Sequence, residues 1–251
     1  MSTAWSTFAS FGRTLLGGLT HLIYPNTCWV CSDVMPVTQE HLCLTCFPAL
    51  TIDPFSTCPR CSSTVGPHLT RAEGCLDCQA VPLAFDGAFR MAPYDGILRD
   101  VILRMKQWTG EDLAEVVGAI WARKMAERLA PLNADVIIPI PLHWMRRWRR
   151  GFNSCDILAA RLARELKIPC WTRILRRTRA TLQQSQQPNP TARRENVKYA
   201  FQAQVGDAVR DKTVLLVDDV LTTGATASEA ARALRVYKPK AIYVVTMAHG
   251  R

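Results

Sequence analysis

The sequence lacks any apolar stretch long enough to cross a membrane, and it has no low-complexity tract and no array of long repeats. Residues 1–24 carry one early charge, Arg13, and their apolar side chains are interrupted by serine, glycine and threonine. A secretory signal needs a basic start and a continuous apolar stretch. We therefore expect an amphipathic segment that packs on the rest of a cytoplasmic protein. A weak contact with a membrane surface is the alternative.

Acidic residues are comparatively few, 21 against 31 basic residues, so the net charge is +10. The basic excess is clustered rather than spread. One cluster consists of Trp144, Arg146, Arg147, Trp148, Arg149 and Arg150, and a second consists of Arg173, Arg176, Arg177 and Arg179. Clustered arginine with interleaved tryptophan favours a polyanion, either a nucleic acid or a highly phosphorylated small molecule. Trp144, Arg146, Arg147 and Trp148 are the candidates for nucleic-acid contact.

Cysteine is concentrated near the amino terminus, where eight of the ten cysteines form four Cys-x-x-Cys pairs. The pairs are Cys28/Cys31, Cys43/Cys46, Cys58/Cys61 and Cys75/Cys78. Each pair can give two thiolates to one tetrahedral metal, so the four pairs predict two structural Cys₄ zinc sites. A disulfide framework would need an oxidising compartment. An iron–sulfur cluster would use the same ligands.

The four cysteine pairs can combine into two metal sites in two ways. A cross-brace would join alternate pairs, whereas tandem ribbons would join neighbouring ones. Neighbouring pairs are separated by eleven and thirteen residues, which suits short hairpin ribbons, so we favour the tandem form. We expect a double zinc-ribbon region over residues 25–82. It is too small to bury a core, so the metal would supply its folding energy.

From residue 83 to residue 251 the pattern alternates between strands and helices, which predicts an α/β domain with a mainly parallel sheet. Strands are expected at 85–94, 135–141, 212–217 and 241–247. Helices are expected at 97–106, 113–129, 153–166 and 228–234. Residues 143–153 are expected to form a basic loop after a strand end, which is where such sheets bind ligands.

The most informative segment is 214–226, VLLVDDVLTTGAT. Four apolar β-formers are followed by Asp218 and Asp219 and by a Thr-rich turn, and a helix begins after it. A loop between a strand end and a helix N-terminus presents backbone N–H groups to an anion. Thr222, Thr223, Gly224, Ala225 and Thr226 therefore form a candidate phosphate cradle, and the carboxylates beside it suit two ribose hydroxyls. The expected ligand is a ribose 5-phosphate.

This segment resembles the ribose-phosphate motif of the type I phosphoribosyltransferase fold. The resemblance implies that Asp218 and Asp219 bind the 2′- and 3′-hydroxyls and that the turn binds the 5′-phosphate. It also implies a pyrophosphate site on an earlier loop. Chemically suited residues are Lys106, Arg149, Arg150 and Gly151, since arginine offers a fork of donors to phosphate. The polar segment 177–196 suggests a mobile flap.

The ordered set of motifs resembles the ComF/GntX family, phosphoribosyltransferase-like proteins associated with DNA uptake. The set comprises the four cysteine pairs, Tyr94-x-Gly96 with Lys106, the 138–153 segment, the flap residues Gln184, Arg193 and Asn196, and the 214–226 segment. In the flap, Gln187 replaces a leucine of the family pattern, and Arg193-x-x-Asn196 comes one residue late.

The resemblance implies a protein that binds phosphoribosyl pyrophosphate with Mg²⁺ and acts in DNA uptake or the use of external DNA. Single-stranded DNA and the DNA-uptake machinery are the implied partners. A metabolic phosphoribosyltransferase with no nucleic-acid role is the alternative. Phosphoribosyl transfer would be electrostatic, through a ribosyl cation and a departing pyrophosphate. No residue is assigned as a general base.

Overall fold

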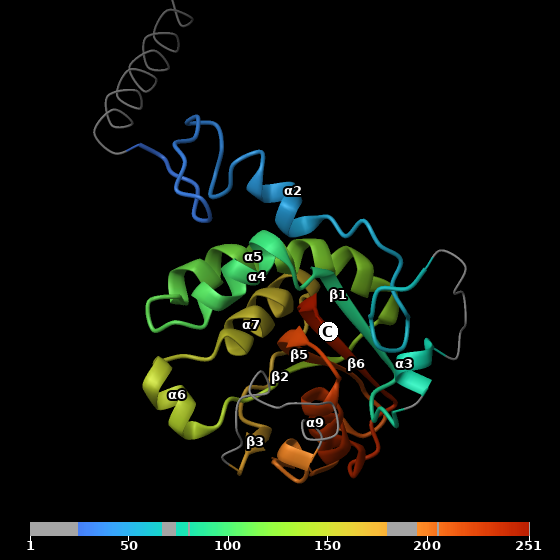
Figure 1. The fold of residues 1–251 in the computed structure, drawn as a ribbon. Helices are drawn as coiled ribbons and strands as arrows, with labels where there is room; N and C mark the ends of the chain where they lie inside the picture. The colour runs from blue at the N-terminus through green and yellow to red at the C-terminus, as the bar shows by residue number, and fades with distance from the viewer. Residues whose placement is uncertain (1–24, 67–73, 80, 180–194, 205, 251) are drawn as a thin grey trace, which may run out of the picture. The chain divides into compact units, whose positions relative to one another are not determined.

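The computed structural model describes residues 25–66, 74–79, 81–179, 195–204 and 206–250 (Figure 1). Two compact units divide the chain, Met1–Leu50 and Thr51–Arg251. The first two cysteine pairs lie in the first unit. The other two pairs lie in the second unit, together with the main sheet. The predicted boundaries at residues 24 and 82 stay predictions.

The main sheet has four strands in the order β1-β6-β5-β2, and every neighbouring pair is parallel (Figure 1). The strands are β1 Gly87–Pro93, β2 Val136–Pro139, β5 Thr213–Leu221 and β6 Ala241–His249. Their apolar side chains are buried on both faces, as a parallel sheet covered by helices requires. The predicted α/β architecture with a parallel sheet is confirmed.

Helices cover both faces of the sheet. They are α4 Gly96–Met105, α5 Glu111–Leu129, α7 Ser154–Leu166 and α9 Ala225–Arg235. Val214 and Leu216 of β5 share one buried cluster with α9. Because strand side chains alternate, Leu215 and Val217 face the opposite side, where α7 packs against β5 and β2 and against α5. Figure 1 shows α4, α5 and α7 grouped on one side of the sheet and α9 on the other.

Smaller elements complete the described residues. They are α2 Cys46–Thr51, α3 Leu76–Gln79, η1 Ala130–Leu132, α6 Trp144–Arg150, β3 Leu175–Arg177, β4 Phe201–Ala203 and η3 Gly206–Val209. β3 and β4 form a separate antiparallel pair. Among the described residues, no helix is both long enough and apolar enough to cross a membrane.

The expected basic loop at residues 143–153 is wrong in part, because α6 occupies its centre. The Nδ1 atom of His143 accepts a hydrogen bond from the backbone N–H of Met145, 3.4 Å away, and so caps the helix. Gly151 ends the helix with φ of 85° and donates its N–H to the carbonyl of Arg147 at 2.8 Å. Arginine is a good helix former, so a run of arginine between two such caps is consistent with a helix.

The second cysteine-rich segment covers the edge of the sheet at β1. The backbone N–H of Ala88 donates to the carbonyl of Pro59 at 3.2 Å, which pairs an edge group that would otherwise face outward. Arg90, which is 1% exposed, forms an ion pair with Asp53 at 2.8 Å and also donates to the Thr64 hydroxyl at 2.8 Å. This segment is thus an integral part of the second unit.

Candidate functional site

The acidic pair lies within β5, since this strand runs four residues beyond the predicted end at Val217. Asp218 and Asp219 are half-buried. Oδ1 of Asp218 lies 3.4 Å from the thiol of Cys155, and Oδ2 of Asp219 lies 3.4 Å from the hydroxyl of Ser154. Ser154 and Cys155 open helix α7, so that helix lines one side of the pair. The sequence pattern did not single out these two contacts, because they depend on which helix covers the strand end.

Lys106 follows the last residue of α4 and reaches the same pair. Its Nζ lies 2.9 Å from Oδ1 of Asp219. Burial alone would lower the pKa of Lys106, but Asp219 and then Asp218 raise it above its usual value. Burial and the neighbouring Asp219 raise the pKa of Asp218 to about 7, and Lys106 opposes this shift. Asp218 is therefore poised to change charge near neutral pH.

A Lys106→Met variant should raise the pKa of Asp218 further, because it removes the positive charge that favours the carboxylate. The measurement is a pH titration of the Asp218 carboxyl carbon by NMR, which should have its midpoint near pH 7 in the wild type. Lys124→Met, which removes an exposed charge from α5, should leave the midpoint unchanged. Equal midpoints in the Lys106 and Lys124 variants would contradict the assigned role of Lys106.

A turn rich in threonine follows the acidic pair and leads into α9. Gly224 caps this helix with φ of 72° and ψ of 2°, a left-handed conformation that favours glycine. A Cβ at this position would lie 3.1 Å from Cδ2 of Leu83. The N–H of Ala225 points to Oγ1 of Thr223 at 3.4 Å. The turn therefore places half-buried threonine hydroxyls and helix N-terminal N–H groups directly after the carboxylates.

Arginine side chains of α6 and β3 lie near one another. Arg146 and Arg150, one turn apart on α6, are half-buried. Burial and then the nearby Arg150 lower the pKa of Arg146. Burial and then Arg146 lower the pKa of Arg177, at the end of β3, to about 10, while Asp218 opposes this. Arg146 therefore lies close enough to Arg150 and Arg177 to interact with both, and Arg177 interacts in turn with Asp218. Arg177 was noted only as part of a basic run, because its place depends on the unpredicted pairing of β3 with β4.

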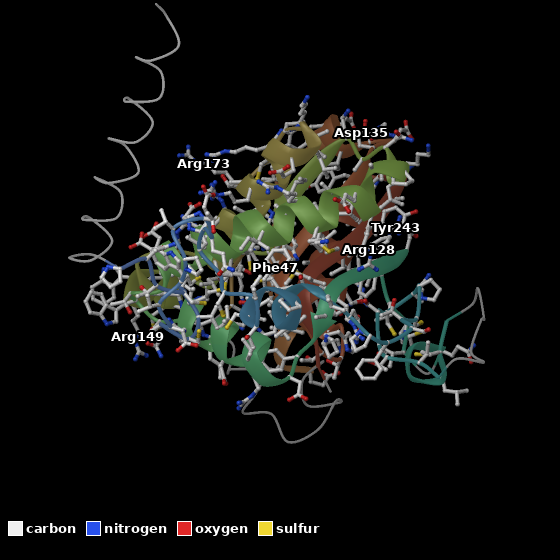
Figure 2. The ribbon with its side chains drawn as sticks, turned by 90° about the horizontal axis from the view of Figure 1, so that it is seen from above. Phe47, Arg128, Asp135, Arg149, Arg173 and Tyr243 are labelled. Atoms are coloured by element: carbon white, nitrogen blue, oxygen red, sulfur yellow. The ribbon has the colours of Figure 1, made fainter. Side chains whose placement is uncertain are left out.

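The other arginines of α6 point elsewhere. Arg147 forms an ion pair with Asp156 of α7 at 3.0 Å. Arg149 is exposed, and Figure 2 shows its side chain at the outside of the molecule. Gly151 is exposed at the end of the helix. Of the residues that the sequence assigned to pyrophosphate, the structure therefore places Lys106 against the acidic pair and Arg150 near Arg146, and it turns Arg149 outward.

The predicted flap is described only at its ends. Gln184 and Arg193 lie outside the described residues, whereas Asn196 is described and half-buried. Three residues later, the N–H of Tyr199 donates to Glu229 of α9 at 3.0 Å. The residues that directly follow this segment therefore contact α9.

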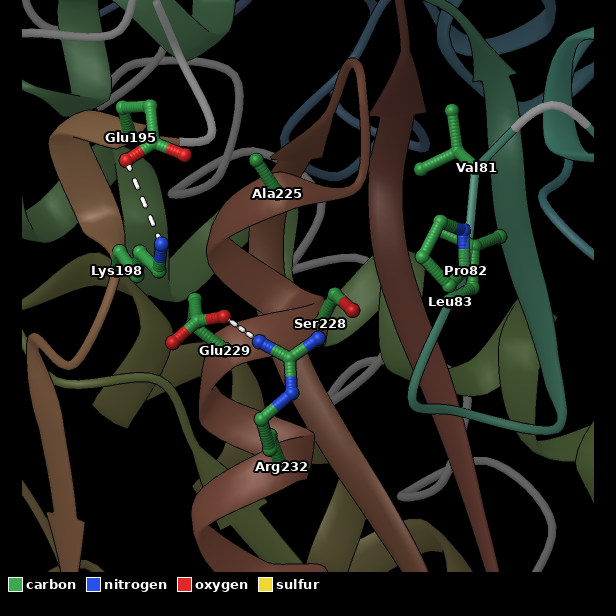
Figure 3. A pocket seen from close by; sticks show the side chains of 9 residues that line it. All are labelled: Val81, Pro82, Leu83, Glu195, Lys198, Ala225, Ser228, Glu229 and Arg232. Carbon is green, nitrogen blue, oxygen red and sulfur yellow. Dashed lines mark hydrogen bonds and ion pairs between the residues drawn. The ribbon is translucent and has the colours of Figure 1, made fainter. Parts of the chain in front are cut away.

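A pocket of about 160 Å³ lies on the outer side of the first turns of α9 (Figure 3). Residues 81–83 form its apolar wall. Two ion pairs line it, Lys198 with Glu195 at 3.7 Å and Arg232 with Glu229. Neither Asp218 nor Asp219 lines this pocket, so it is distinct from the acidic pair.

The eight clustered cysteines form two groups in sequential order, as the tandem arrangement predicts. One group is Cys28, Cys31, Cys43 and Cys46, and the other is Cys58, Cys61, Cys75 and Cys78. Within each group the sulfur atoms all lie within 4.8 Å of one another. This is the donor set of a tetrahedral zinc site.

The surroundings of the sulfur atoms fit a metal-bound thiolate. Backbone N–H groups donate to Sγ of Cys28 at 3.4 Å and to Sγ of Cys58 at 3.2 Å. Burial alone would raise the pKa of Cys28, but such backbone donors lower it to about 6. Gly74, with φ of 101°, leaves the space beside Cys78 open, since a Cβ there would lie 2.5 Å from Sγ. Both groups can therefore hold zinc.

Comparison with known proteins bears on the resemblance to the phosphoribosyltransferase fold and to the ComF/GntX family. The phosphoribosyl transferase domain model matches residues 149–251. Competence protein F of Haemophilus influenzae is 31% identical over 214 residues, which cover 83% of this chain and 90% of that protein. DNA utilization protein YhgH of Escherichia coli O157:H7 is 32% identical over 219 residues, 85% of this chain and 92% of that protein. Competence protein ComFC of Bacillus subtilis is 25% identical over 204 residues, 78% of each.

The relatives match most of the chain, and together with the domain model they confirm both the family and the type I phosphoribosyltransferase fold class predicted from the sequence. The chain belongs to the ComF family, whose members here include competence protein F, YhgH and ComFC.

Proposed function

We propose that this protein binds phosphoribosyl pyrophosphate together with Mg²⁺ at the carboxyl edge of its sheet. One observation carries the proposal: a half-buried carboxylate pair is followed directly by a left-handed glycine turn at a helix N-terminus. Carboxylates accept hydrogen bonds from hydroxyls, and helix N-terminal N–H groups bind phosphate. A ribose 5-phosphate presents both hydroxyls and a phosphate. Titration calorimetry with the magnesium-loaded ligand tests the proposal.

In the proposed complex, Asp218 and Asp219 accept hydrogen bonds from the ribose 2′- and 3′-hydroxyls. Thr222, Thr223, Gly224, Ala225 and Thr226 surround the 5′-phosphate. When ionised, Asp218 accepts at both oxygens and more strongly, whereas the protonated acid keeps only part of this acceptor capacity. Because burial and Asp219 raise its pKa to about 7, ligand affinity should increase as the pH rises through neutrality.

The pyrophosphate of the ligand would lie against Arg146, Arg150 and Arg177. Arg150 lowers the pKa of Arg146, and Arg146 lowers the pKa of Arg177, so an anion bound among the three would relieve this repulsion. Mg²⁺ would neutralise the remaining pyrophosphate charge, with the carboxylates of Asp218 and Asp219 as its nearest candidate protein ligands. In phosphoribosyl transfer, the arginines would stabilise the departing pyrophosphate while the acidic pair fixes the ribose.

We place this site in a protein that serves the use of DNA, because the names of its relatives are competence protein F and DNA utilization protein. Direct contact with single-stranded DNA is a second candidate function, and a specific observation favours it. Trp144 and Trp148, 67% and 83% exposed, lie one turn apart on α6, and the exposed Arg149 follows them. Exposed aromatic rings beside cations form a stacking surface for unpaired bases.

A Trp144→Ala, Trp148→Ala variant should weaken single-stranded DNA binding by about tenfold or more, since base stacking contributes about 1–3 kcal/mol per base. An Arg146→Ala, Arg147→Ala variant should flatten the salt dependence by about one to two units, because fewer counterions are released. Fluorescence anisotropy over a series of salt concentrations measures both. Arg123→Ala, Lys124→Ala, on the exposed face of α5, is the charge-matched control. Absence of salt-sensitive binding by the zinc-loaded wild type would leave a metabolic phosphoribosyltransferase role.

A further inference from the structure

A chain of buried hydrogen bonds runs from the second cysteine group to the end of the central sheet. Sγ of Cys61 lies 3.3 Å from Oγ of Ser63, and the same oxygen lies 3.3 Å from Nε2 of His249. Ser63 and His249 are each only 5% exposed. They are 186 positions apart in the sequence, so this contact ties the cysteine-rich segment to the last strand.

His249 is the last residue of β6, and this strand end is joined to the strands on both sides of it. His249 is paired in register with Leu221 of β5 and with Pro93 of β1. Its carbonyl accepts a hydrogen bond from the N–H of Tyr94 at 2.8 Å, and the N–H of Gly250 donates to the carbonyl of Leu221 at 2.9 Å. Leu221 directly precedes the turn at residues 222–226. The position of His249 therefore influences the position of Leu221, from which residues 222–226 leave the sheet.

We propose that Ser63 is a positioning residue that couples the second cysteine group to the phosphate turn. A metal ion held by Cys58, Cys61, Cys75 and Cys78 would fix the Cys61–Ser63 segment. Ser63 would then hold the His249 ring, and His249 would hold the ends of β6 and β5. The turn at residues 222–226 is thereby kept in the geometry that presents its N–H groups. The inference rests on the proposed phosphoribosyl site and names a residue outside that site which controls it.

The first cysteine group supplies an internal control, because the two groups share the same local geometry. The N–H of Cys28 donates to Asp33 O, and the N–H of Cys58 donates to Ser63 O, both at 2.9 Å. Ser32 and Ser62 have matching φ values of 65° and 63°. Oδ2 of Asp33 lies 3.2 Å from Sγ of Cys31, and Oγ of Ser63 lies 3.3 Å from Sγ of Cys61. Asp33 thus occupies the place of Ser63 in the other unit of the chain.

The second cysteine group also contacts β1, and this strand provides a second connection to the end of β6. Pro59, between Cys58 and Cys61, accepts a hydrogen bond from Ala88 of β1. Figure 1 shows α3, which carries Cys78, beside this strand. β1 in turn pairs with β6 up to His249. A shift of the cysteine-rich segment would therefore act on the strand end through both its backbone and the Ser63 side chain.

The test is hydrogen exchange measured by mass spectrometry on the zinc-loaded, ligand-free full chain. Ser63→Ala should retain two equivalents of zinc, and amides of residues 222–226 and of Gly250 should exchange faster than in the wild type. Affinity for phosphoribosyl pyrophosphate with Mg²⁺ should fall by about fivefold or more, the usual size of coupling between sites. Asp33→Ala should change neither the exchange of this turn nor the affinity.

Two variants of the partner residue keep the inference falsifiable if Ser63→Ala does not fold. His249→Leu should reproduce the faster exchange, whereas His249→Gln, which keeps a side chain able to bond to the Ser63 hydroxyl, should restore much of the protection. Unchanged exchange at residues 222–226 in a zinc-replete Ser63→Ala or His249→Leu protein would overturn the inference. A wild type that binds no phosphoribosyl pyrophosphate would instead refute the proposed function, since the exchange measurement needs no ligand.

Discussion

An Asp218→Asn, Asp219→Asn variant should bind magnesium-loaded phosphoribosyl pyrophosphate about 100-fold more weakly than the wild type, or not at all. A hydrogen bond to a charged group contributes about 1.5–3 kcal/mol, and the variant loses two charged acceptors. At about 1.4 kcal/mol per factor of ten, the combined loss reaches two or more orders of magnitude. Equilibrium dialysis at pH 8 measures it. At that pH Asp218 of the wild type is ionised, because its pKa is raised only to about 7.

The matched control for this variant is Asp207→Asn. It removes an exposed carboxylate that is paired with Arg210 on the surface. This change should leave the affinity unaltered. Because the double variant also deprives Lys106 of its partner at 2.9 Å, its thermal unfolding and zinc content must match those of the wild type before the loss is assigned to ligand contacts. Equal affinities of the double variant and the wild type would refute the assigned ribose contacts.

A Cys75→Ser variant should lose about one of two zinc equivalents and should lower the melting temperature of the second unit by about 10 °C. The loss of a zinc ligand removes folding free energy, and about 3 kcal/mol corresponds to a shift of this size in a domain of about 200 residues. The second cysteine group covers the edge of β1 through the bond from Ala88 to Pro59. Native mass spectrometry gives the zinc count, and calorimetry gives the melting temperature.

Cys28→Ser is the matched control, because Cys28 belongs to the other sulfur group. It should also lose about one zinc equivalent, but the melting temperature of the second unit should be unchanged. If either single change released both metals, the pairing of the cysteines would be that of a coupled cross-brace. Because the structure groups the cysteines sequentially, we expect neither single change to release both metals.

The sequence was most informative where function depends on contiguous residues. The acidic pair and the glycine turn follow one another along the chain, so their common place at the end of β5 could be predicted from residues 214–226. The same is true of the two sulfur groups, since sequential pairing joins cysteines that are close in sequence. In both cases a short segment and the ordinary geometry of strands, turns and metal sites determine the arrangement.

Contacts between distant segments were not predictable in the same way. The approach of Arg177 to Arg146 depends on the pairing of β3 with β4, two three-residue strands with too little pattern to recognise. The hydrogen bond between Ser63 and His249 joins two ends of the second unit. The basic segment was predicted as a loop because tryptophan and arginine show no apolar periodicity there. Its helical caps, His143 and Gly151, were the overlooked signal.

Titration calorimetry of the zinc-loaded wild type tests the central claim most directly. Phosphoribosyl pyrophosphate should bind at one site per chain in the presence of Mg²⁺. Ribose 5-phosphate should bind more weakly, because it lacks the pyrophosphate that the three arginines would contact. Inorganic phosphate should bind more weakly still, because it offers no hydroxyls to Asp218 and Asp219. Absence of saturable heat with phosphoribosyl pyrophosphate, or equal affinity for all three compounds, would contradict a phosphoribosyl site at this edge of the sheet.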